Sequence, residues 1–421
     1  MKIALCGPAD IHALGSFRGE DCSSVAPGLG GTATTPLIIE FLRRGHEVTL
    51  YTLSKGISSG KEYRWANLRI AVGPFRERHL AATYYGPEIE FLQRAIEADA
   101  PAFVHAHWTY EFALGALRSG TPTVTTIHDL PWNVFRYFRD PHRAVRLLMA
   151  YEVALRAKQL TAVSGSAAIH FARYMKRGAE IEVIYNGLPA EVFAMGRRPC
   201  AGPYRELTFA TVLEGWSRRK NAKIALQAFD SVRRRIPGVR LLMFGCDYEQ
   251  GGRAHRWAEK RGLEGKVSFV GPLPHDDLLR RVWHEVDIVV HPSLDEAFSM
   301  AALEAMALRK ALIAGIATPG MEEMLESGAG VLVDMRNPSA LAEAMHQLAI
   351  NEDYRRFFAD GGFERAFRLY RLSAAADGYE AVYARIMESE RSKSRGQRLG
   401  FTPGTAAVEA SLDHALDGLG R

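Results

Sequence analysis

Short apolar runs rich in β-branched residues alternate with longer amphipathic stretches along most of the chain. Early in the chain these runs occupy residues 3–6, 48–53, 68–72, 103–106, 123–127, 160–163 and 183–185. Later they occupy residues 208–212, 241–244, 267–270, 288–291, 312–314 and 331–333. Near-continuously apolar strands separated by helices are typical of parallel sheets that helices cover on both faces. The pattern therefore predicts two doubly wound α/β sheets, one after the other.

The alternation is interrupted between residues 186 and 207 by a stretch rich in Gly and Pro. We place the boundary there, which gives a first domain at 1–195 and a second that begins at 196. From about residue 389 onward, Ser, Arg, Gly and Pro are mixed, and we expect a flexible tail at 389–421. Because ligands of such sheets bind at the carboxyl ends of the strands, the cleft between the two sheets is the expected site.

The composition narrows the class of protein. Hydrophobic residues make up 47% and charged residues 24% of the 421, which excludes wholesale disorder and a small disulfide-stapled module. No apolar run approaches the length of about 18 residues that a spanning helix needs. The four cysteines lie far apart without a CxxC pair, which favours a cytoplasmic protein without a zinc site. Arginine supplies 42 of the 53 cations and suits phosphate binding, although a genome-wide arginine bias is the simpler explanation.

A glycine-rich loop follows the first predicted strand and precedes an amphipathic stretch. It reads Gly28-Leu29-Gly30-Gly31-Thr32-Ala33. Glycines let the backbone approach a ligand, and the free N–H groups of the next helix favour an anion. An ordinary tight turn explains the loop equally well. The long interval from the first strand is wrong for a dinucleotide fingerprint, which disfavours a dehydrogenase.

Histidines stand at or just after two predicted strand ends. His105 and His107 are two residues apart and therefore share one face of a strand. They could form a metal pair, but hydrogen-bonded structural histidines are the commoner arrangement. His128 ends the run at 123–127, where Asp129-Leu130-Pro131 forces a turn, so we expect it at the edge of the cleft.

A basic loop follows the first strand of the second domain, in Gly215-Trp216-Ser217-Arg218-Arg219-Lys220-Asn221. Three consecutive cations before a helix oppose a buried anion well, because Coulomb attraction and the helix N-terminus act together. A solvated basic loop is the alternative.

Two glutamates eight residues apart give the sharpest signal. Glu296 falls in the turn after the run at 288–291, and Glu304 lies about two turns into an apolar helix. A carboxylate surrounded by Ala, Leu and Met is unfavourable unless something hydrogen-bonds it, and sugar hydroxyls could be that partner. The alternative is a surface glutamate followed by one that interacts with the helix dipole.

In this order, the motifs resemble the GT4 family of retaining, nucleotide-sugar-dependent glycosyltransferases with the GT-B fold. The resemblance covers residues 1–388 and rests on the glycine loop, His-Ala-His-Trp, Thr-Ile-His-Asp, Ala-Val-Ser-Gly-Ser, Val-Ile-Tyr-Asn-Gly, Arg-Lys-Asn and the E-x7-E pair. It implies two Rossmann-like domains facing across a cleft, at 1–195 for the acceptor and 196–369 for the nucleotide sugar. It also implies a helix at 370–388 that crosses back to the first domain.

The resemblance assigns roles residue by residue. His128, Lys220 and Glu296 are the implied catalytic residues. The implied donor-binding residues are Gly30, Gly31, Arg218, Arg219, Lys220, Val270, Leu273, Phe298, Ser299, Met300 and Glu304. Candidates on the acceptor side are His107, Trp108, Trp132 and Arg136. The implied reaction transfers a sugar from a UDP or GDP donor, with retention of configuration, to a glycan, lipid-linked or small-molecule acceptor, as in polysaccharide biosynthesis. No DxD motif is present, so no metal or other cofactor is expected.

Two positions depart from the family pattern. Glu214 stands where the family usually has an arginine upstream of the lysine, and Ala297 replaces a glycine. We therefore expect Arg218 or Arg219 to supply the second phosphate contact while pairing with Glu214. A non-hydrolysing sugar-nucleotide epimerase and a catalytically silent glycan-binding or protein-binding partner are the alternatives. No nucleic-acid partner is expected. Aromatic and basic residues mix at 132–143, which suggests a peripheral contact with the inner face of a membrane, although an ordinary amphipathic packing helix is the commoner explanation.

Overall fold

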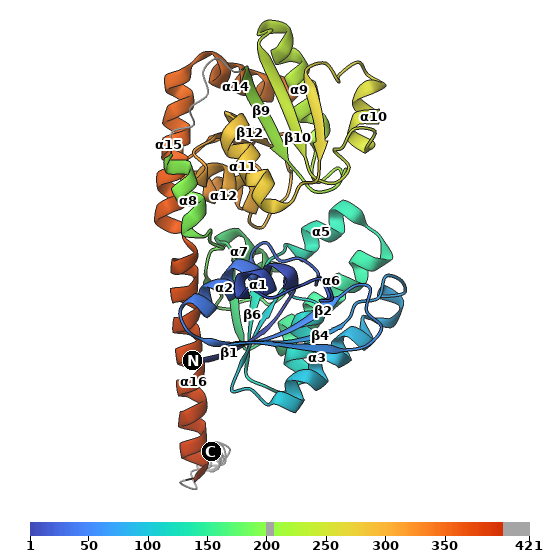
Figure 1. Ribbon diagram of the computed structural model, residues 1–421, viewed down its shortest axis with the longest axis vertical. Coiled ribbons are helices and arrows are strands. Elements are labelled where there is room, and N and C mark those ends of the chain that lie inside the picture. The colour runs from blue at the N-terminus through green and yellow to red at the C-terminus, as the bar shows by residue number, and fades with distance from the viewer. Residues whose placement is uncertain (199–205, 399–421) are drawn as a thin grey trace, which may run out of the picture. The chain divides into compact units, whose positions relative to one another are not determined.

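The computed structural model describes residues 1–198 and 206–398, with side chains through residue 392. Residues 1–377 form one compact unit, and the unit from residue 378 onward is described by itself. Figure 1 shows two sheets in the first unit. We call the part of the chain that holds the first sheet the first half (residues 1–198) and the part that holds the second sheet the second half (residues 206–377). Both halves have the α/β organisation that the apolar pattern predicts.

Within the described residues, the first half holds one eight-stranded sheet. In spatial order its strands are β3 (Lys61–Trp65), β4 (Leu68–Pro74), β2 (Glu47–Ser54), β1 (Lys2–Cys6), β5 (Val104–His107), β6 (Thr123–Ile127), β7 (Gln159–Ala162) and β8 (Glu182–Val183). All neighbours pair in parallel except β3 and β4. The apolar pattern missed β3, because this antiparallel edge strand is largely exposed and polar.

Helices fill the connections of the first half. They are α1 (Ile11–Arg18), α2 (Thr34–Arg43), α3 (Gly86–Asp99), α4 (Glu111–Arg118), α5 (Pro131–Phe138), α6 (Pro141–Arg156) and α7 (Gly165–Tyr174), with a short 3-10 turn η1 (Ala81–Thr83). The next helix, α8 (Ala190–Arg197), leads from β8 to the second half and packs against it. Several begin at the residues that favour helix starts. The carboxylate of Asp140 caps α6 by accepting from the Arg143 N–H, and Pro141 occupies the first turn, where its missing N–H costs nothing.

The second half holds a parallel sheet of six strands among the residues described. Its order is β11 (Val267–Gly271), β10 (Val239–Phe244), β9 (Leu207–Val212), β12 (Ile288–His291), β13 (Ala311–Gly315) and β14 (Val331–Val333). The strand order reverses between β9 and β12, so the loops that follow these two strands leave the sheet side by side. The basic loop and the loop that carries Glu296 therefore meet. Their backbones are joined by a hydrogen bond of 2.8 Å from the Leu294 N–H to the Arg219 carbonyl.

Helices cover both faces of the second sheet. They are α9 (Ala222–Arg235), α10 (Arg253–Glu259), α11 (His275–Glu285), α12 (Met300–Ala307), α13 (Met321–Met324), α14 (Pro338–Ile350) and α15 (Glu352–Leu369), with a 3-10 turn η2 (Glu326–Gly328). Alternate side chains of β10 belong to different core clusters. Leu241 and Met243 pack with α9 and α14, whereas Leu242 and Phe244 pack with α8 and α12. A strand buried on both faces cannot show polar alternation, which explains its continuous apolar run.

The last described helix, α16 (Leu372–Arg398), extends beyond the predicted range of 370–388. Six of the ten residues at 389–398 are Glu, Gln, Lys or Arg, which have good helix propensity, so the sequence supports further turns despite three serines and a glycine. The rest of the predicted tail, residues 399–421, lies outside the described residues. Within the first unit, the start of α16 contacts the end of α2, because Arg44 forms hydrogen bonds to Asp377 and to the Ser373 carbonyl. In the described part of the chain, no helix is long and apolar enough to span a membrane.

Gly245, directly after β10, offers a test of how tightly the loops at the carboxyl ends are packed. Its φ is +111°, and an added Cβ would lie 1.7 Å from the Leu213 carbonyl oxygen. We expect Gly245→Ala to lower the free energy of unfolding by about 2–4 kcal/mol, from backbone strain and overpacking together. The control is Gly120→Ala, where φ is +74° but nothing lies within 4 Å of the added atom. Equal losses for the two variants in thermal unfolding would contradict this account.

Candidate active site

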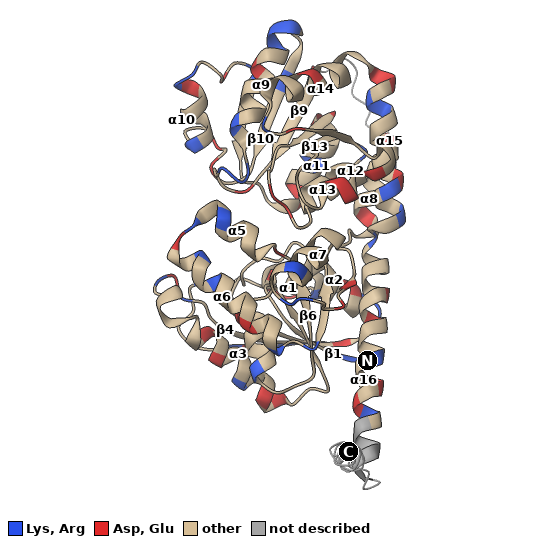
Figure 2. Ribbon diagram, turned by 180° about the vertical axis from the view of Figure 1, so that it is seen from behind, with Lys and Arg blue, Asp and Glu red and all other residues tan. Residues whose placement is uncertain are grey.

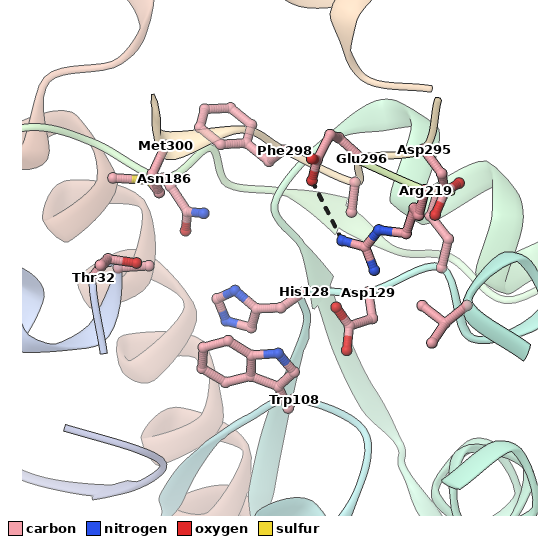
Figure 3. Close-up of a pocket in the computed structure, with 14 residues that line it drawn as sticks. Thr32, Trp108, His128, Asp129, Asn186, Arg219, Asp295, Glu296, Phe298 and Met300 are labelled. Atoms are coloured by element: carbon pink, nitrogen blue, oxygen red, sulfur yellow. Dashed lines mark ion pairs between the residues drawn. The ribbon is translucent and has the colours of Figure 1, made fainter. Parts of the chain in front are cut away.

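A cavity of about 170 Å³ lies at the carboxyl ends of both sheets and is lined by residues of both halves. Figure 3 shows it. The first half contributes Thr32, Ala33, Trp108, His128, Asp129, Leu130, Val134 and Asn186, and the second half contributes Arg219, Asp295, Glu296, Ala297, Phe298 and Met300. Its position agrees with the expectation that ligands of doubly wound sheets bind at the carboxyl ends of the strands.

Glu296 is the charged centre of the cavity. Its carboxylate lies 2.6 Å from Lys220 Nζ, 3.6 Å from the Arg219 guanidinium and 3.5 Å from His291 Nε2, while its side chain is only 9% exposed. Burial alone would raise the pKa of Glu296, but Lys220, His291 and Arg219 outweigh burial and hold the pKa well below its usual range. The residue is therefore a carboxylate at any physiological pH.

His128 faces this charge from the first half. Its Nε2 lies 2.9 Å from Nδ1 of His107, and its ring stacks on Trp108 with centroids 4.2 Å apart. Burial, with a smaller contribution from His107, holds the pKa of His128 well below its ordinary value, so the ring is neutral. A neutral imidazole whose Nε2 is engaged offers Nδ1 to a ligand.

The other two histidines extend inward from His128. The rings of His105 and His107 are 4.0 Å apart on one face of β5, as the spacing predicts. His105 Nε2 lies 2.7 Å from the Thr126 hydroxyl, so it is a hydrogen-bonded structural histidine. No cluster of three or more His, Cys, Asp or Glu side chains with the geometry of a metal site occurs in the described ranges.

Backbone groups border the cavity on two sides. Gly30 and Gly31 adopt φ values of +79° and +146°, which only glycine adopts readily, and the next residues, Thr32 and Ala33, line the cavity. On the opposite side, α12 begins after Ser299, whose hydroxyl accepts the Ala302 N–H. Its neighbours Phe298 and Met300 line the cavity. Two helix starts, α2 and α12, are thus close to one cavity and favour an anion there.

Glu304 does not line this cavity. It is buried, and its carboxylate lies 2.8 Å from His275 Nε2 at the start of α11. The hydrogen bond to Glu304 raises the pKa of His275, although burial opposes it. The prediction that a buried glutamate in this apolar helix needs a hydrogen-bonding partner holds, and the partner inside the chain is His275. Two of the implied donor-binding residues lie just before His275: Val270 is at the end of β11 and Leu273 is in the loop that follows it.

The expected pairing of Glu214 is not the arrangement found. Its carboxylate accepts the backbone N–H of Cys246 at 3.5 Å, because the loop after β10 lies beside it. Arg218 and Arg219 are separated instead: Arg219 lines the cavity of Figure 3, and Arg218 lines a second cavity together with Arg136. Trp132 is turned toward α6, where its indole N–H donates to the Tyr151 hydroxyl at 2.8 Å.

The cavity also holds four polar residues to which the sequence motifs gave no role, namely Thr32, Asp129, Asn186 and Asp295. Each adjoins or belongs to a motif that was noticed: Thr32 lies in the glycine-rich loop, Asp129 follows His128, Asn186 lies in Val-Ile-Tyr-Asn-Gly, and Asp295 precedes Glu296. Asp295 is 2% exposed and accepts a hydrogen bond of 2.7 Å from the Asn133 amide of the first half. Burial raises the pKa of Asp295 to about 6, with Arg219 and Asn133 opposing the shift.

Comparison with known proteins identifies the family. Residues 30–192 match the family described as Glycosyltransferase Family 4, and residues 206–365 match Glycosyl transferases group 1. The chain is a GT4-type glycosyltransferase. The resemblance to GT4 is thereby confirmed, and neither of the two matched families is one of epimerases.

Whole-chain relatives of this glycosyltransferase agree. The D-inositol 3-phosphate glycosyltransferase of Corynebacterium glutamicum is 26% identical over 403 residues, which cover 86% of this chain and 94% of that protein. Among solved structures, sucrose-phosphate synthase from Thermosynechococcus elongatus superposes with a TM-score of 0.73 at 20% identity, over 92% of this chain and 100% of that one. HepE from Anabaena, in complex with UDP and glucose, gives 0.64 at 16% identity, over 91% and 99%. These likenesses confirm the predicted GT-B fold.

Asp295 gives this glycosyltransferase a pH-dependent stability. Because its folded-state pKa of about 6 exceeds the ordinary value of 3.8, the folded state binds the extra proton between these pH values. The contribution of Asp295 to the free energy of unfolding therefore falls as pH rises through this window, and the loss is complete above it. We expect Asp295→Asn to raise the melting temperature relative to wild type by about 1–3 °C more at pH 8 than at pH 4. An equal difference at both pH values, or the same trend in the exposed control Asp353→Asn, would refute this.

Proposed function

We propose that this glycosyltransferase moves a sugar from a nucleoside diphosphate sugar to an acceptor hydroxyl with retention of configuration and without a metal ion. The observation that carries the proposal is the cavity in which neutral His128 of the first half faces the Glu296–Lys220–Arg219 cluster of the second. The complex of the structural neighbour HepE with UDP and glucose supports a donor of this chemistry.

The cations of the second half suit a departing diphosphate. Breaking the bond between the anomeric carbon and the phosphate oxygen leaves negative charge on the diphosphate, and fixed positive groups stabilise it most when water is excluded. Lys220 and Arg219 are only 18% and 21% exposed and are already paired with Glu296, so they need little reorganisation. An arriving diphosphate would pair with Lys220 and Arg219 in part. Glu296 would then be available to accept hydrogen bonds from hydroxyls of the donor sugar.

Retention follows from a reaction on one face of the sugar. The acceptor oxygen bonds to the anomeric carbon on the side from which the diphosphate leaves, through an oxocarbenium-like state. The departing phosphate oxygen takes up the proton of the acceptor hydroxyl, so no side chain has to act as general base. Glu296 and His128 then orient the sugar rather than exchange protons, in keeping with a carboxylate that stays ionised and an imidazole that stays neutral. A paired-carboxylate glycosidase would need a protonated acid instead.

Removing the charge of Lys220 tests the donor site. Lys220→Gln keeps a hydrogen-bond donor for Glu296, and it should lower donor kcat/KM by about ten- to a hundredfold, since a charged contact to the diphosphate is lost. The matched control is Lys223→Gln, three residues along in α9, whose ammonium lies over the Trp216 and Trp257 rings instead. The measurement is acceptor-dependent release of nucleoside diphosphate from a panel of UDP and GDP sugars. If both variants keep wild-type kinetics, the donor site is assigned wrongly.

Metal independence is tested separately. Two protein cations, Lys220 and Arg219, supply the positive charge that a divalent ion supplies in other transferases. We expect turnover with excess EDTA to stay within about twofold of turnover with magnesium or manganese. Loss of activity in EDTA that either ion restores would show that the diphosphate needs a metal.

A further inference from the structure

A second cavity, of about 370 Å³, adjoins the first. Both halves contribute to it: the residues that line it include four arginines, namely Arg136, Arg139, Arg218 and Arg336. Two of them come from α5 and its C-terminal end, one from the loop after β9 and one from the loop after β14. Figure 2 marks the basic residues of α5 in blue. We call this the arginine cavity.

The four guanidinium groups are available to a ligand. All four residues are exposed, and none of them belongs to an ion pair found among the described residues, although many other arginines of the chain do. Three of them act on one neighbour: Arg336, Arg218 and Arg136 all oppose the upward pKa shift that burial and Asp295 impose on the Tyr137 hydroxyl. Four like charges around one hollow repel each other, so an anion that binds there relieves this repulsion.

Asp295 connects the two cavities. It lines both, and its carboxylate is held in place by Asn133 Nδ2 at 2.7 Å. A carboxylate would repel a simple anion placed next to it, but it accepts a hydrogen bond from a hydroxyl. The pair of cavities thus presents a hydroxyl-binding group between a catalytic cavity and a strongly basic one. A molecule with hydroxyls at one end and a phosphate at the other matches this order.

We propose that the acceptor carries a phosphate group, which the arginine cavity binds while Asp295 holds a hydroxyl of the same acceptor at the entrance to the catalytic cavity. The inference rests on the proposed function and names its acceptor class. A phosphate suits the site because planar guanidinium groups form paired hydrogen bonds with phosphate oxygens. The donor diphosphate is assigned elsewhere, to Lys220 and Arg219, so the two phosphate sites are distinct.

Binding of inorganic phosphate tests the arginine cavity directly. Calorimetric titration is done at constant ionic strength with saturating UDP present, so that the donor phosphate positions are already filled. We expect wild type to bind phosphate and Arg136→Gln/Arg336→Gln to bind it at least tenfold more weakly. The control Arg94→Gln/Arg356→Gln removes two exposed arginines that pair only within their own helices, and it should match wild type. Absence of phosphate binding by wild type, or equal weakening in both double variants, would overturn the proposal.

Kinetics then identify the source of the phosphate. Matched acceptors, a free polyol or hexose and its phosphomonoester, are compared with the donor that gives turnover. In a parallel arm, protein is sedimented with neutral phosphatidylcholine vesicles with and without polyprenyl phosphate. A preference of at least tenfold for the phosphomonoester that the double variant loses supports a small-molecule acceptor. Binding only to polyprenyl phosphate vesicles, lost in the same variant, supports a lipid-linked one. If neither effect is observed, the inference is overturned.

The two proposals fail in different ways. UDP binding, measured before phosphate is added, reports on the donor site and should be within twofold of wild type in the arginine variants. If wild type does not bind UDP or any other nucleoside diphosphate, the proposed function fails. If UDP binds and the arginine cavity takes no phosphate, only the inference about the acceptor fails.

Discussion

A buried carboxylate, Glu296, imposes the constraint on which the rest of the site depends. An ion in this surrounding is stable only if opposite charge comes with it, and Lys220 and Arg219 supply that charge, while His291 adds a close polar contact. Lys220 and Arg219 follow β9, and His291 ends β12. These strands are neighbours because the order of the sheet reverses between them. The topology of the second half therefore makes the charge cluster possible, and the cluster in turn fixes the loops that line the cavity.

The two halves differ in their electrostatics. On the second half, the cavity wall carries ions that compensate one another. On the first half, His105, His107 and His128 are stacked inward from the cavity, and burial keeps all three neutral. Charge that develops on a leaving group is consequently met from one side, while the three histidines of the other side offer hydrogen bonds without adding charge. This division suits a reaction in which a diphosphate departs and a neutral sugar stays.

Polar contacts hold the loop of Glu296 and the segment that follows β13 against the first half. The Ser164 hydroxyl donates to the Ala297 carbonyl at 2.6 Å, and the Gly320 N–H donates to the Ser166 hydroxyl at 3.0 Å. Glu323 accepts both the Gly165 N–H, at the start of α7, and the Tyr185 hydroxyl. A carboxylate at a helix N-terminus is favourable, so this contact adds to the others. Hydrogen bonds between the two halves thus hold the backbone near both cavities before a substrate binds.

The sequence by itself determined the two covered parallel sheets, since continuous apolar runs leave little choice. It also singled out His128, Lys220 and Glu296, because each lies in a loop that follows a strand, and the family resemblance gave them their catalytic roles. Tertiary structure decided the partners. Glu304 pairs with His275, and Glu214 turns to the loop after β10, away from the basic loop. Periodicity and strand ends are local properties that one segment reveals. Which side chain pairs with a buried charge depends on loops from distant segments of the chain. The four arginines of the second cavity also come from distant segments, and only the folded chain brings them together.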